Sequence, residues 1–467
     1  MYDQNVILIK NTKTKDVSST SKKQKHFITY LPTVSDHCSS IVLTVIVFLI
    51  LVSLFVSFQS KYPQYDSQPL QRRLICYYTF SSPNDTNVLN PDRIDPLLCT
   101  HLIVGFAYVS NNSLHLTEHQ LGVFNATTLL KVKNPNLKVL VSIGGAGGNI
   151  GFPEMVVDHQ HRKEYVTTLK DYNFCSFIKS VDEFVRAYKC DGIDLDWEFP
   201  SSDSKQRMHF TQLLYELRKE INRQHRHKFI VSVAVAAQQV VVDLSYDVAY
   251  MNDYVDFVNI MTYDFHFYTT LTPITGLNAP LYPASRDFFN GFNTDFSLKY
   301  WMERGMDKGK INVGLPTYGH TFELFNENNN KLGAPAKGYG RLGTNGFADY
   351  NQICSFLRDG VNVVFDYASR SPYAWKGAEW VSFDDGTSLS IKAQYVYDNG
   401  FGGAMVYSLN ADDYNGSCVV LRLVMTALVG CAVLLGGGCG RCDFWPCELS
   451  VVARGWATGW FAVVAER

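Results

Sequence analysis

The sequence predicts a closed (β/α)8 TIM barrel with a small α+β insertion between its seventh and eighth strands, preceded by one transmembrane helix. From Arg73 onward, short apolar or β-branched runs alternate with longer amphipathic stretches. Such alternation implies parallel strands joined by crossover helices. Eight strand–helix units over about 350 residues fit a closed barrel, with a doubly wound open sheet as the alternative.

The eight runs are short enough for strands and are bounded by polar or glycine-containing segments. In chain order they are Leu74–Thr79, His101–Val109, Lys138–Gly145, Gly192–Glu198, Phe229–Ala237, Asp256–Asp264, Ile311–Tyr318 and Gly402–Leu409. Between them, Phe174–Tyr188 and Met208–Gln224 carry apolar residues at three- and four-residue spacing, which predicts helices. The barrel is expected over residues 74–425.

The seventh and eighth runs lie too far apart for a single connecting helix. About 80 residues separate them, and a connection of that length is expected to carry structure of its own. Phe322–Leu324 and Glu379–Phe383 resemble short strands set among Gly- and Asn-rich turns. We expect a small insertion at about residues 322–390.

One apolar run near the N-terminus predicts a membrane anchor. Ile41–Phe58 is an uncharged stretch of 18 residues, near the lower length limit for crossing a bilayer. A buried core helix and a cleaved signal peptide are the alternatives, although about forty residues precede the run and a signal peptide normally has a short leader. The preceding lysines are Lys10, Lys13, Lys15, Lys22, Lys23 and Lys25.

The lysine excess places the N-terminus in the cytoplasm. The expectation is a single-pass type II membrane protein with a cytoplasmic tail at 1–40, an anchor at 41–58, a linker at 59–73 and an extracellular or lumenal barrel. Eleven cysteines suit an oxidising compartment. The composition changes after Cys418, and residues 426–467 are an uncertain tail.

Composition excludes several partners. The net charge of −2 gives no broad attraction to nucleic acid. Cys439-Gly-Arg-Cys442 has no second pair of ligands at zinc spacing, so no metal site is expected. We also expect no cofactor.

The fourth run carries a ladder of carboxylates. It reads Asp191-Gly-Ile-Asp-Leu-Asp-Trp-Glu198-Phe-Pro200. Strand side chains alternate between faces, so Asp194, Asp196 and Glu198 share one face while the intervening apolar residues share the other. In a barrel the apolar face meets the helices, and Glu198 then lies at the carboxyl-terminal rim, where barrel enzymes place their active sites.

Three acids this close cannot all be ionised, so at least one keeps its proton at neutral pH. A protonated acid beside an anion is what cleavage of a glycosidic bond requires. A solvated strand face, a calcium ladder and a magnesium site are the structural alternatives. The apolar opposite face and Pro200 argue against an exposed edge, and no further acids supply the oxygens that calcium prefers.

This segment resembles the DxxDxDxE signature of glycoside hydrolase family 18, and the likeness extends from about Leu74 to Cys418, in the animal chitinase and chitinase-like branch. Other matching motifs are Ser142-Ile-Gly-Gly145, Met261-Thr-Tyr-Asp264, Gly314-Leu-Pro-Thr-Tyr-Gly319, Gly333-Ala-Pro335 and Gly402-Gly-Ala-Met405. The resemblance implies disulfides between Cys76 and Cys99 and between Cys354 and Cys418. It also implies the insertion described above.

The resemblance implies a retaining, substrate-assisted hydrolysis of β-1,4-linked N-acetylglucosamine glycans, such as chitin or its oligomers, through an oxazolinium ion. Glu198 would be the general acid and then the base. Asp196 would orient the acetamido group, Asp194 would share a proton with Asp196, and Tyr263 would donate to the acetamido oxygen. The implied substrate-binding residues are Tyr77, Phe106, Gly144, Gly145, Phe199, Met261, Asp264 and Tyr407.

The chain departs from the family pattern in its aromatic platform. Tyr407 stands where active chitinases usually have the Trp beneath the cleaved sugar, and it could still form a floor. Ala146 replaces another usual Trp, and a further one is missing from Thr79-Phe-Ser-Ser. Phe267 and Tyr268 occupy a usual Gly-Ser-Trp, and His320 replaces an Arg.

Each lost ring removes surface for sugar stacking. A chitinase-like lectin without turnover is therefore the second hypothesis, and a structural or signalling ectodomain the third. Lectin-like members of the family often lose the terminal Glu. The presence of Glu198 favours the enzyme.

Overall fold

The computed structural model describes residues 72–81, 88–148, 151–158, 162, 177–202, 205–223, 229–284 and 291–414. The predicted cytoplasmic tail, membrane anchor, nearly all of the linker and the C-terminal tail lie outside these ranges and stay predictions. Within them, no helix combines the length and apolar character needed to cross a bilayer.

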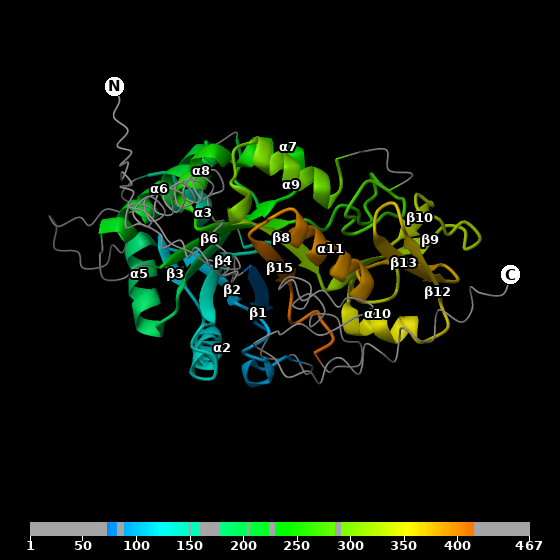
Figure 1. Cartoon of the computed structure of the whole chain (residues 1–467), viewed down its shortest axis with the longest axis horizontal. Helices are drawn as coiled ribbons and strands as arrows, with labels where there is room; N and C mark the ends of the chain where they lie inside the picture. The colour runs from blue at the N-terminus through cyan, green and yellow to red at the C-terminus, as the bar shows by residue number, and fades with distance from the viewer. Residues whose placement is uncertain are drawn as a thin grey trace, which may run out of the picture. The chain divides into compact units, whose positions relative to one another are not determined.

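Eight parallel strands close into a barrel surrounded by helices, which confirms the predicted fold (Figure 1). β1 closes the barrel by pairing with both β2 and β15. Around the barrel the strands are β1 (Arg73–Thr79), β2 (His101–Ser110), β4 (Lys138–Gly144), β5 (Gly192–Asp196), β6 (Ile230–Ala236), β7 (Phe257–Met261), β8 (Ile311–Pro316) and β15 (Gly403–Tyr407). Each predicted run contributes one of them.

The barrel strands bury both faces, as strands enclosed by helices must. On β1, Leu74, Cys76 and Tyr78 belong to the outer core beneath the helices. The alternate residues Ile75 and Tyr77 belong to a second cluster inside the barrel. This period of two gives each strand one face for stability and one for the barrel interior.

Helices follow the strands around the barrel (Figure 1). Their bounds are α2 Glu118–Thr128, α3 Phe152–Val156, α5 Phe177–Tyr188, α6 Gln206–Arg223, α7 Gln239–Ser245, α8 Val248–Tyr254, α9 Thr294–Glu303 and α11 Gly386–Asp398. Short 3-10 turns span Pro91–Arg93, Leu129–Val132 and Lys308–Lys310. The two helices predicted by periodicity correspond to α5 and α6, and α6 begins two residues earlier than expected.

The predicted insertion is a six-stranded antiparallel sheet between β8 and β15. Its elements are β9 (Tyr318–Leu324), β10 (Ala336–Gly338), β11 (Phe347–Asp349), α10 (Tyr350–Leu357), β12 (Asn362–Asp366), β13 (Ser371–Lys376) and β14 (Glu379–Ser382). It has its own core, which includes Phe322, Tyr373 and Trp380. A three-residue strand, β3 (Ser113–His115), also forms a hairpin with β2.

The insertion begins earlier than the sequence indicated. β8 ends at Pro316, two residues before the end of the predicted run, and Tyr318 already belongs to β9. Between them the backbone N–H of Thr317 donates to the carbonyl oxygen of Tyr407 at 2.9 Å. The chain therefore leaves the barrel at Thr317, and the apolar run continues from one sheet directly into the other.

Candidate active site

β5 delivers the three carboxylates of the predicted ladder to one face. Asp194 and Asp196 lie on the strand, and Glu198 lies two residues beyond its end. Asp194 is registered with Ser142 on β4, and Asp196 with Gly144. All three acids follow the strand toward the carboxyl-terminal mouth of the barrel.

The residues that alternate with the acids, on β5 and just beyond its end, face the helices. Ile193, Leu195 and Trp197 are buried in the outer core. The Trp197 ring stacks on Phe152 of α3 with centroids 5.2 Å apart, and meets Phe210 of α6 edge-on at 5.8 Å. This packing fixes the rotation of the strand, and with it the direction of the acids.

Asp194 is fully buried and held by donors from four other strands. The donors are the hydroxyls of Tyr77 (2.8 Å), Ser142 (2.8 Å) and Ser232 (2.6 Å), and the side-chain amide of Asn259 (3.4 Å). Burial raises the pKa of Asp194, and these hydrogen bonds oppose the increase. The site is built to accept a carboxylate at this position.

Asp196 has the opposite surroundings. It is buried, and its Oδ1 has no hydrogen-bond partner among the described residues. The groups that donate to Asp194 are hydroxyls and an amide, and the sharing of a proton between Asp194 and Asp196 stays a prediction. Burial, followed by the charges of Glu198 and Asp194, raises the pKa of Asp196 well above its ordinary value.

Glu198 is partly buried at the rim. Burial, followed by the negative charge of Asp264, raises the pKa of its carboxyl to about 7. A carboxylic acid with such a pKa keeps its proton over much of the neutral range. It is therefore suited to donate that proton to a leaving oxygen.

A group of tyrosines lies beside the ladder. The Tyr407 ring lies 5.7 Å from Tyr77 and 6.0 Å from Tyr263, measured between centroids. The Tyr263 hydroxyl has one hydrogen-bond contact within the described chain, a 3.9 Å approach to the thioether sulfur of Met405. Burial raises the pKa of Tyr263, so its hydroxyl stays a neutral donor with a weak partner.

Asp264 follows β7 in a left-handed backbone conformation, with φ at 57°. Its backbone N–H donates to the side-chain oxygen of Asn278 at 2.9 Å. Its Oδ1 accepts from the Tyr318 hydroxyl at 2.6 Å and lies 2.7 Å from Nε2 of His320. The residue that replaces the family's usual arginine therefore contacts the acid that the motif predicted.

Two glycines allow the chain to pass close to the ladder. Gly144 has φ at 113°, and a Cβ there would lie 2.1 Å from the carbonyl oxygen of Asp196. A Cβ on Gly145, which has φ at 77°, would lie 2.7 Å from the Phe106 ring. Both positions require glycine, since a side chain would displace either the ladder's backbone or the ring.

The other predicted binding residues divide between two clusters. Phe106, Met261 and Tyr407 pack against the interior cluster that contains Tyr77 and Tyr263. Phe199 packs against the outer core. The structure thus brings together most of the predicted set, and the assignment of Phe199 to the substrate stays a prediction.

Aromatic side chains continue from this floor toward the insertion. Tyr318 stacks on Phe347 with centroids 4.4 Å apart, and Phe267 lies 5.7 Å from His320. Phe267 and Phe347 are 45% and 36% exposed, so both present ring surface to solvent. The site therefore has aromatic surface on the insertion side, although Ala146 supplies none.

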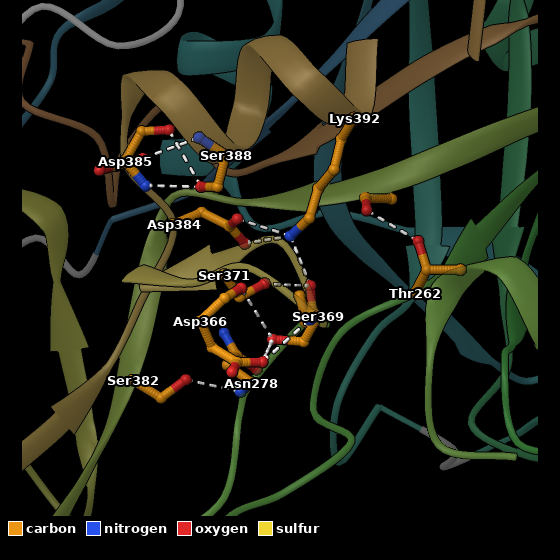
Figure 2. Close-up of polar contacts among 12 residues, drawn as sticks. Thr262, Asn278, Asp366, Ser369, Ser371, Ser382, Asp384, Asp385, Ser388 and Lys392 are labelled. Carbon is orange, nitrogen blue, oxygen red and sulfur yellow. Dashed lines mark hydrogen bonds and ion pairs between the residues drawn. The ribbon is translucent and has the colours of Figure 1, made fainter. Parts of the chain in front are cut away.

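Buried polar contacts fix the loop that carries Asn278, as Figure 2 shows. The backbone N–H of Asn278 donates to Ser382 Oγ at 2.6 Å. Lys392 of α11 donates to the carbonyl oxygen of Ala279 and to Asp384 Oδ2, the latter at 2.7 Å. The insertion and α11 together therefore support the residue that holds Asp264.

One predicted disulfide is confirmed. Cys76 on β1 is bonded to Cys99, with Cα atoms 6.1 Å apart. Cys354 on α10 also belongs to a disulfide. Cys418, the partner that the resemblance implies, lies outside the described residues.

Among the residues that the structure describes, no group of three or more His, Cys, Asp or Glu side chains is arranged to hold a metal ion. Within the ladder, Asp194 instead accepts hydrogen bonds from hydroxyls and an amide. Their arrangement suits proton transfer.

Several residues of the site were not predicted individually. Ser232, Asn259 and Asn312 are buried polar residues in otherwise apolar strands, and that isolation is the one signal that marks them. Asn278 lies in a loop with no such pattern. It becomes recognisable only through its contacts with Asp264 and with the backbone of Tyr318.

Comparison with known proteins agrees with this architecture. Residues 73–412 match the glycosyl hydrolases family 18. Human chitinase-3-like protein 2 is 35% identical over 361 residues, covering 74% of this chain and 88% of the relative. Mouse chitotriosidase-1 is 35% identical over 362 residues, covering 74% of each chain.

Among solved structures, human YKL-39 superposes with a TM-score of 0.70 at 33% identity, covering 76% of this chain and 99% of the other. YKL-39 is described as a pseudo-chitinase that retains chitooligosaccharide binding. The relatives thus include a binding protein as well as chitinases.

Proposed function

This chain belongs to glycosyl hydrolase family 18, and from that premise we propose that it hydrolyses β-1,4-linked N-acetylglucosamine glycans, chitin or chitooligosaccharides, by a retaining, substrate-assisted mechanism. The acetamido oxygen of the substrate is the nucleophile, and the intermediate is an oxazolinium ion. The reaction uses neither metal nor cofactor. Glu198, Asp196, Asp194 and Tyr263 carry the chemistry.

One observation carries the proposal: the floor of the site has two polar atoms that lack strong partners and complement an amide. The buried Oδ1 of Asp196 is an acceptor without a donor among the described residues. The hydroxyl of Tyr263 is a donor directed at a thioether 3.9 Å away. A 2-acetamido group brings one N–H and one carbonyl oxygen, which satisfy both.

In the first step the proton of Glu198 passes to the glycosidic oxygen as the bond from that oxygen to the anomeric carbon breaks. The acetamido oxygen forms a new bond to the anomeric carbon from the opposite face. Oδ1 of Asp196 accepts a hydrogen bond from the acetamido N–H, and the carboxylate of Asp194 beneath it supplies the negative charge that stabilises the oxazolinium ion. Tyr263 orients the attacking oxygen through its hydroxyl.

In the second step Glu198, now ionised, takes a proton from water as the water oxygen attacks the anomeric carbon. The bond to the acetamido oxygen breaks, and the amide is restored. Two displacements at one carbon retain its configuration, and no carboxylate of the protein bonds to the sugar. Asp194 stays a carboxylate below Asp196 throughout.

The remaining predicted residues would line the cleft around the cleaved sugar. Tyr407 would form the floor, and Phe106 and Met261 would pack beside it, with Gly144 and Gly145 leaving room for the ring. Asp264 would bind a sugar hydroxyl at the rim. Tyr77 and Phe199 would pack beneath the residues that contact the sugar. Phe267 and Phe347 would supply stacking surface toward the insertion.

The test is release of a chromophore from a chromogenic N-acetylglucosamine oligomer by the full-length chain, compared with Glu198→Gln. The matched amide keeps the side chain's size and removes its proton donor. Wild-type turnover well above the variant supports the proposal. Equal rates, with oligomer binding intact in both, would refute hydrolysis.

A lectin that binds chitin-type glycans without turnover is the second candidate. The likeness to YKL-39, described as a pseudo-chitinase that retains chitooligosaccharide binding, favours it. The presence of Glu198 with a pKa raised to about 7 favours the enzyme. Calorimetric titration with the N-acetylglucosamine tetramer, together with the hydrolysis assay, separates the two.

We further propose that Cys354 pairs with Cys418, since Cys354 belongs to a disulfide.

We also propose that the chain is a single-pass type II membrane protein with its barrel outside the cytoplasm. The apolar run Ile41–Phe58 and the lysines before it support the orientation. Resistance of the full chain to alkaline extraction from microsomes, lost on deletion of residues 41–58, tests the anchor. Protection of the barrel from protease added outside sealed microsomes tests the orientation.

A further inference from the structure

A chain of hydrogen bonds crosses the barrel interior from its amino-terminal end to the base of the carboxylate ladder. Arg73 Nε donates to Asn312 Oδ1 at 2.9 Å. Asn312 Nδ2 donates to Asn259 Oδ1 at 3.1 Å. Asn259 Nδ2 then lies 3.4 Å from Asp194 Oδ1 and 3.2 Å from the Tyr77 hydroxyl.

The two ends of this chain fix the direction of both amides. A guanidinium can only donate, so Asn312 must present its oxygen to Arg73. Its nitrogen also contacts the carbonyl oxygen of Val258 at 3.2 Å, which requires a donor there. Asn259 must then present its oxygen to Asn312 and its nitrogen to Asp194. The positive end of each dipole points toward the carboxylate.

We propose that Arg73 and Asn312 are positioning residues that, through Asn259, hold Asp194 as a carboxylate, so that the protons of the ladder reside on Asp196 and Glu198. Without the Asn312 donor, the Asn259 amide is free to turn and present its oxygen to Asp194. The pinned orientation excludes that arrangement. The catalytic consequence of this proposal rests on the proposed function, but the protonation state of Asp194 does not.

The other groups around Asp194 do not supply a competing charge. Tyr77, Ser142 and Ser232 present neutral hydroxyls from β1, β4 and β6. Asp196, two residues along β5, is the nearest like charge, and its own pKa is raised well above the ordinary value by burial. Proton uptake therefore favours Asp196 over Asp194.

Arg73, at the other end of this series of hydrogen bonds, stays positively charged at neutral pH. Burial lowers the pKa of Arg73 to about 10, with the nearby Asp256 opposing the decrease, so the guanidinium is a cation at neutral pH. Burial, followed by the charges of Arg73 and Lys138, lowers the pKa of His101 to about 4, so this neighbour is neutral. Arg73 also donates to the carbonyl oxygen of Gly309 at 2.6 Å, which anchors it.

The test is the titration of Asp194 in the full-length chain, followed by 13C NMR of aspartate labelled at its side-chain carboxyl carbon and assigned by the signal lost in Asp194→Asn. Asn312→Val has nearly the same volume and removes the amide. It should raise the titration midpoint of Asp194 by roughly one pH unit, the scale of one hydrogen bond to an ionised group. An unchanged midpoint would overturn the proposal.

Arg73→Gln keeps a donor for Asn312 and removes the charge, so it should raise the titration midpoint of Asp194 by a smaller amount. This variant provides the test if Asn312→Val does not fold. Ser297→Ala, which removes a buried hydroxyl on α9 that donates to the Asn293 carbonyl at 3.1 Å, is the matched control and should leave the midpoint unchanged. If the protein hydrolyses oligomers, the acidic limb of its kcat/KM profile should shift to higher pH in Asn312→Val, by the same amount as the titration midpoint of Asp194. Absence of turnover at every pH would refute the proposed function alone.

Discussion

Nε2 of His320 lies 2.7 Å from Oδ1 of Asp264, and Nδ1 of the same ring lies 3.2 Å from the carbonyl oxygen of Gly346. The ring therefore bridges the carboxylate that follows β7 and the backbone of the insertion. The negative charge of Asp264 contributes to the raised pKa of Glu198, so the residue at position 320 lies beside one of the groups that set that pKa.

Placing a permanent cation at position 320 should move the alkaline limb of the pH profile. The guanidinium of His320→Arg would lie beside Asp264 and offset its negative charge, so the pKa of Glu198 should fall and the decline of kcat/KM should begin a few tenths of a pH unit lower. His320→Gln keeps an uncharged hydrogen-bonding side chain and is the matched control, which should not show this downward shift. Profiles on a chromogenic oligomer check this, and a downward shift in both variants or in neither would contradict it.

The raised pKa of Glu198 predicts a stability cost that depends on pH. In the folded chain this carboxyl keeps its proton until about pH 7, whereas in the unfolded chain it releases it near 4.5. The contribution of this carboxyl to the free energy of unfolding of the wild type is therefore fully present below about pH 4.5 and is lost as pH rises through about 7. Glu198→Gln should be more stable than wild type by about 3 kcal/mol at pH 8 and by little at pH 4, measured by denaturant unfolding.

Loss of the Tyr263 hydroxyl should affect the chemical step more than binding. Tyr263→Phe keeps the ring that packs against Tyr407 and removes the donor proposed for the acetamido oxygen. The kcat should fall by about 10² to 10³-fold while KM changes little. A similar loss in oligomer affinity and in kcat/KM, with kcat preserved, would instead assign the hydroxyl to ground-state binding.

Phe347→Ala should weaken the binding of long oligomers. The exposed ring stacks on Tyr318 at 4.4 Å and continues the aromatic floor toward the insertion. We expect the Kd for an N-acetylglucosamine tetramer to rise about 3- to 10-fold by calorimetry. Tyr367→Ala, which removes a ring that is 74% exposed and contacts Phe365, is the matched control and should bind as wild type does.

The buried ion pair of Lys392 and Asp384 should behave as a unit. Both side chains are 1% exposed, and Lys392 Nζ lies 2.7 Å from Asp384 Oδ2. Lys392→Met leaves the carboxylate unpaired and should destabilise the fold by about 3–5 kcal/mol. Adding Asp384→Leu should restore most of that loss, as measured by urea unfolding. A double variant no more stable than the single one would show that the contacts with the loop matter more than the pairing.

The fold and the carboxylate ladder could be predicted from the sequence because both follow from the regular spacing of apolar and polar residues along strands and helices. Alternation along β5 predicted that Asp194, Asp196 and Glu198 share a face, and the outward packing of Trp197 shows why it holds. The resemblance supplied Tyr263 and Asp264 and the Cys76–Cys99 disulfide, which residue spacing alone leaves open.

The supporting residues could not be predicted because their roles depend on distant contacts. Asn259 and Asn312 each appear as one polar residue in an apolar strand, and only barrel closure brings them to Arg73. Asn278 acts through a loop that the insertion and α11 hold in place. The start of the insertion was misjudged because β8 passes into β9 with a single residue between them.

The pairing of β1 with β15 has a consequence for synthesis of the chain. Arg73 is registered with Gly403, so one edge of the first barrel strand stays unpaired until the last strand has been synthesised. Tyr77 and Tyr407, which face each other across that seam, come from the two extremes of the barrel. A nascent chain stopped before the final strand would expose the edges of β1 and β8, so we expect such truncated products to aggregate or be degraded rather than to retain partial activity.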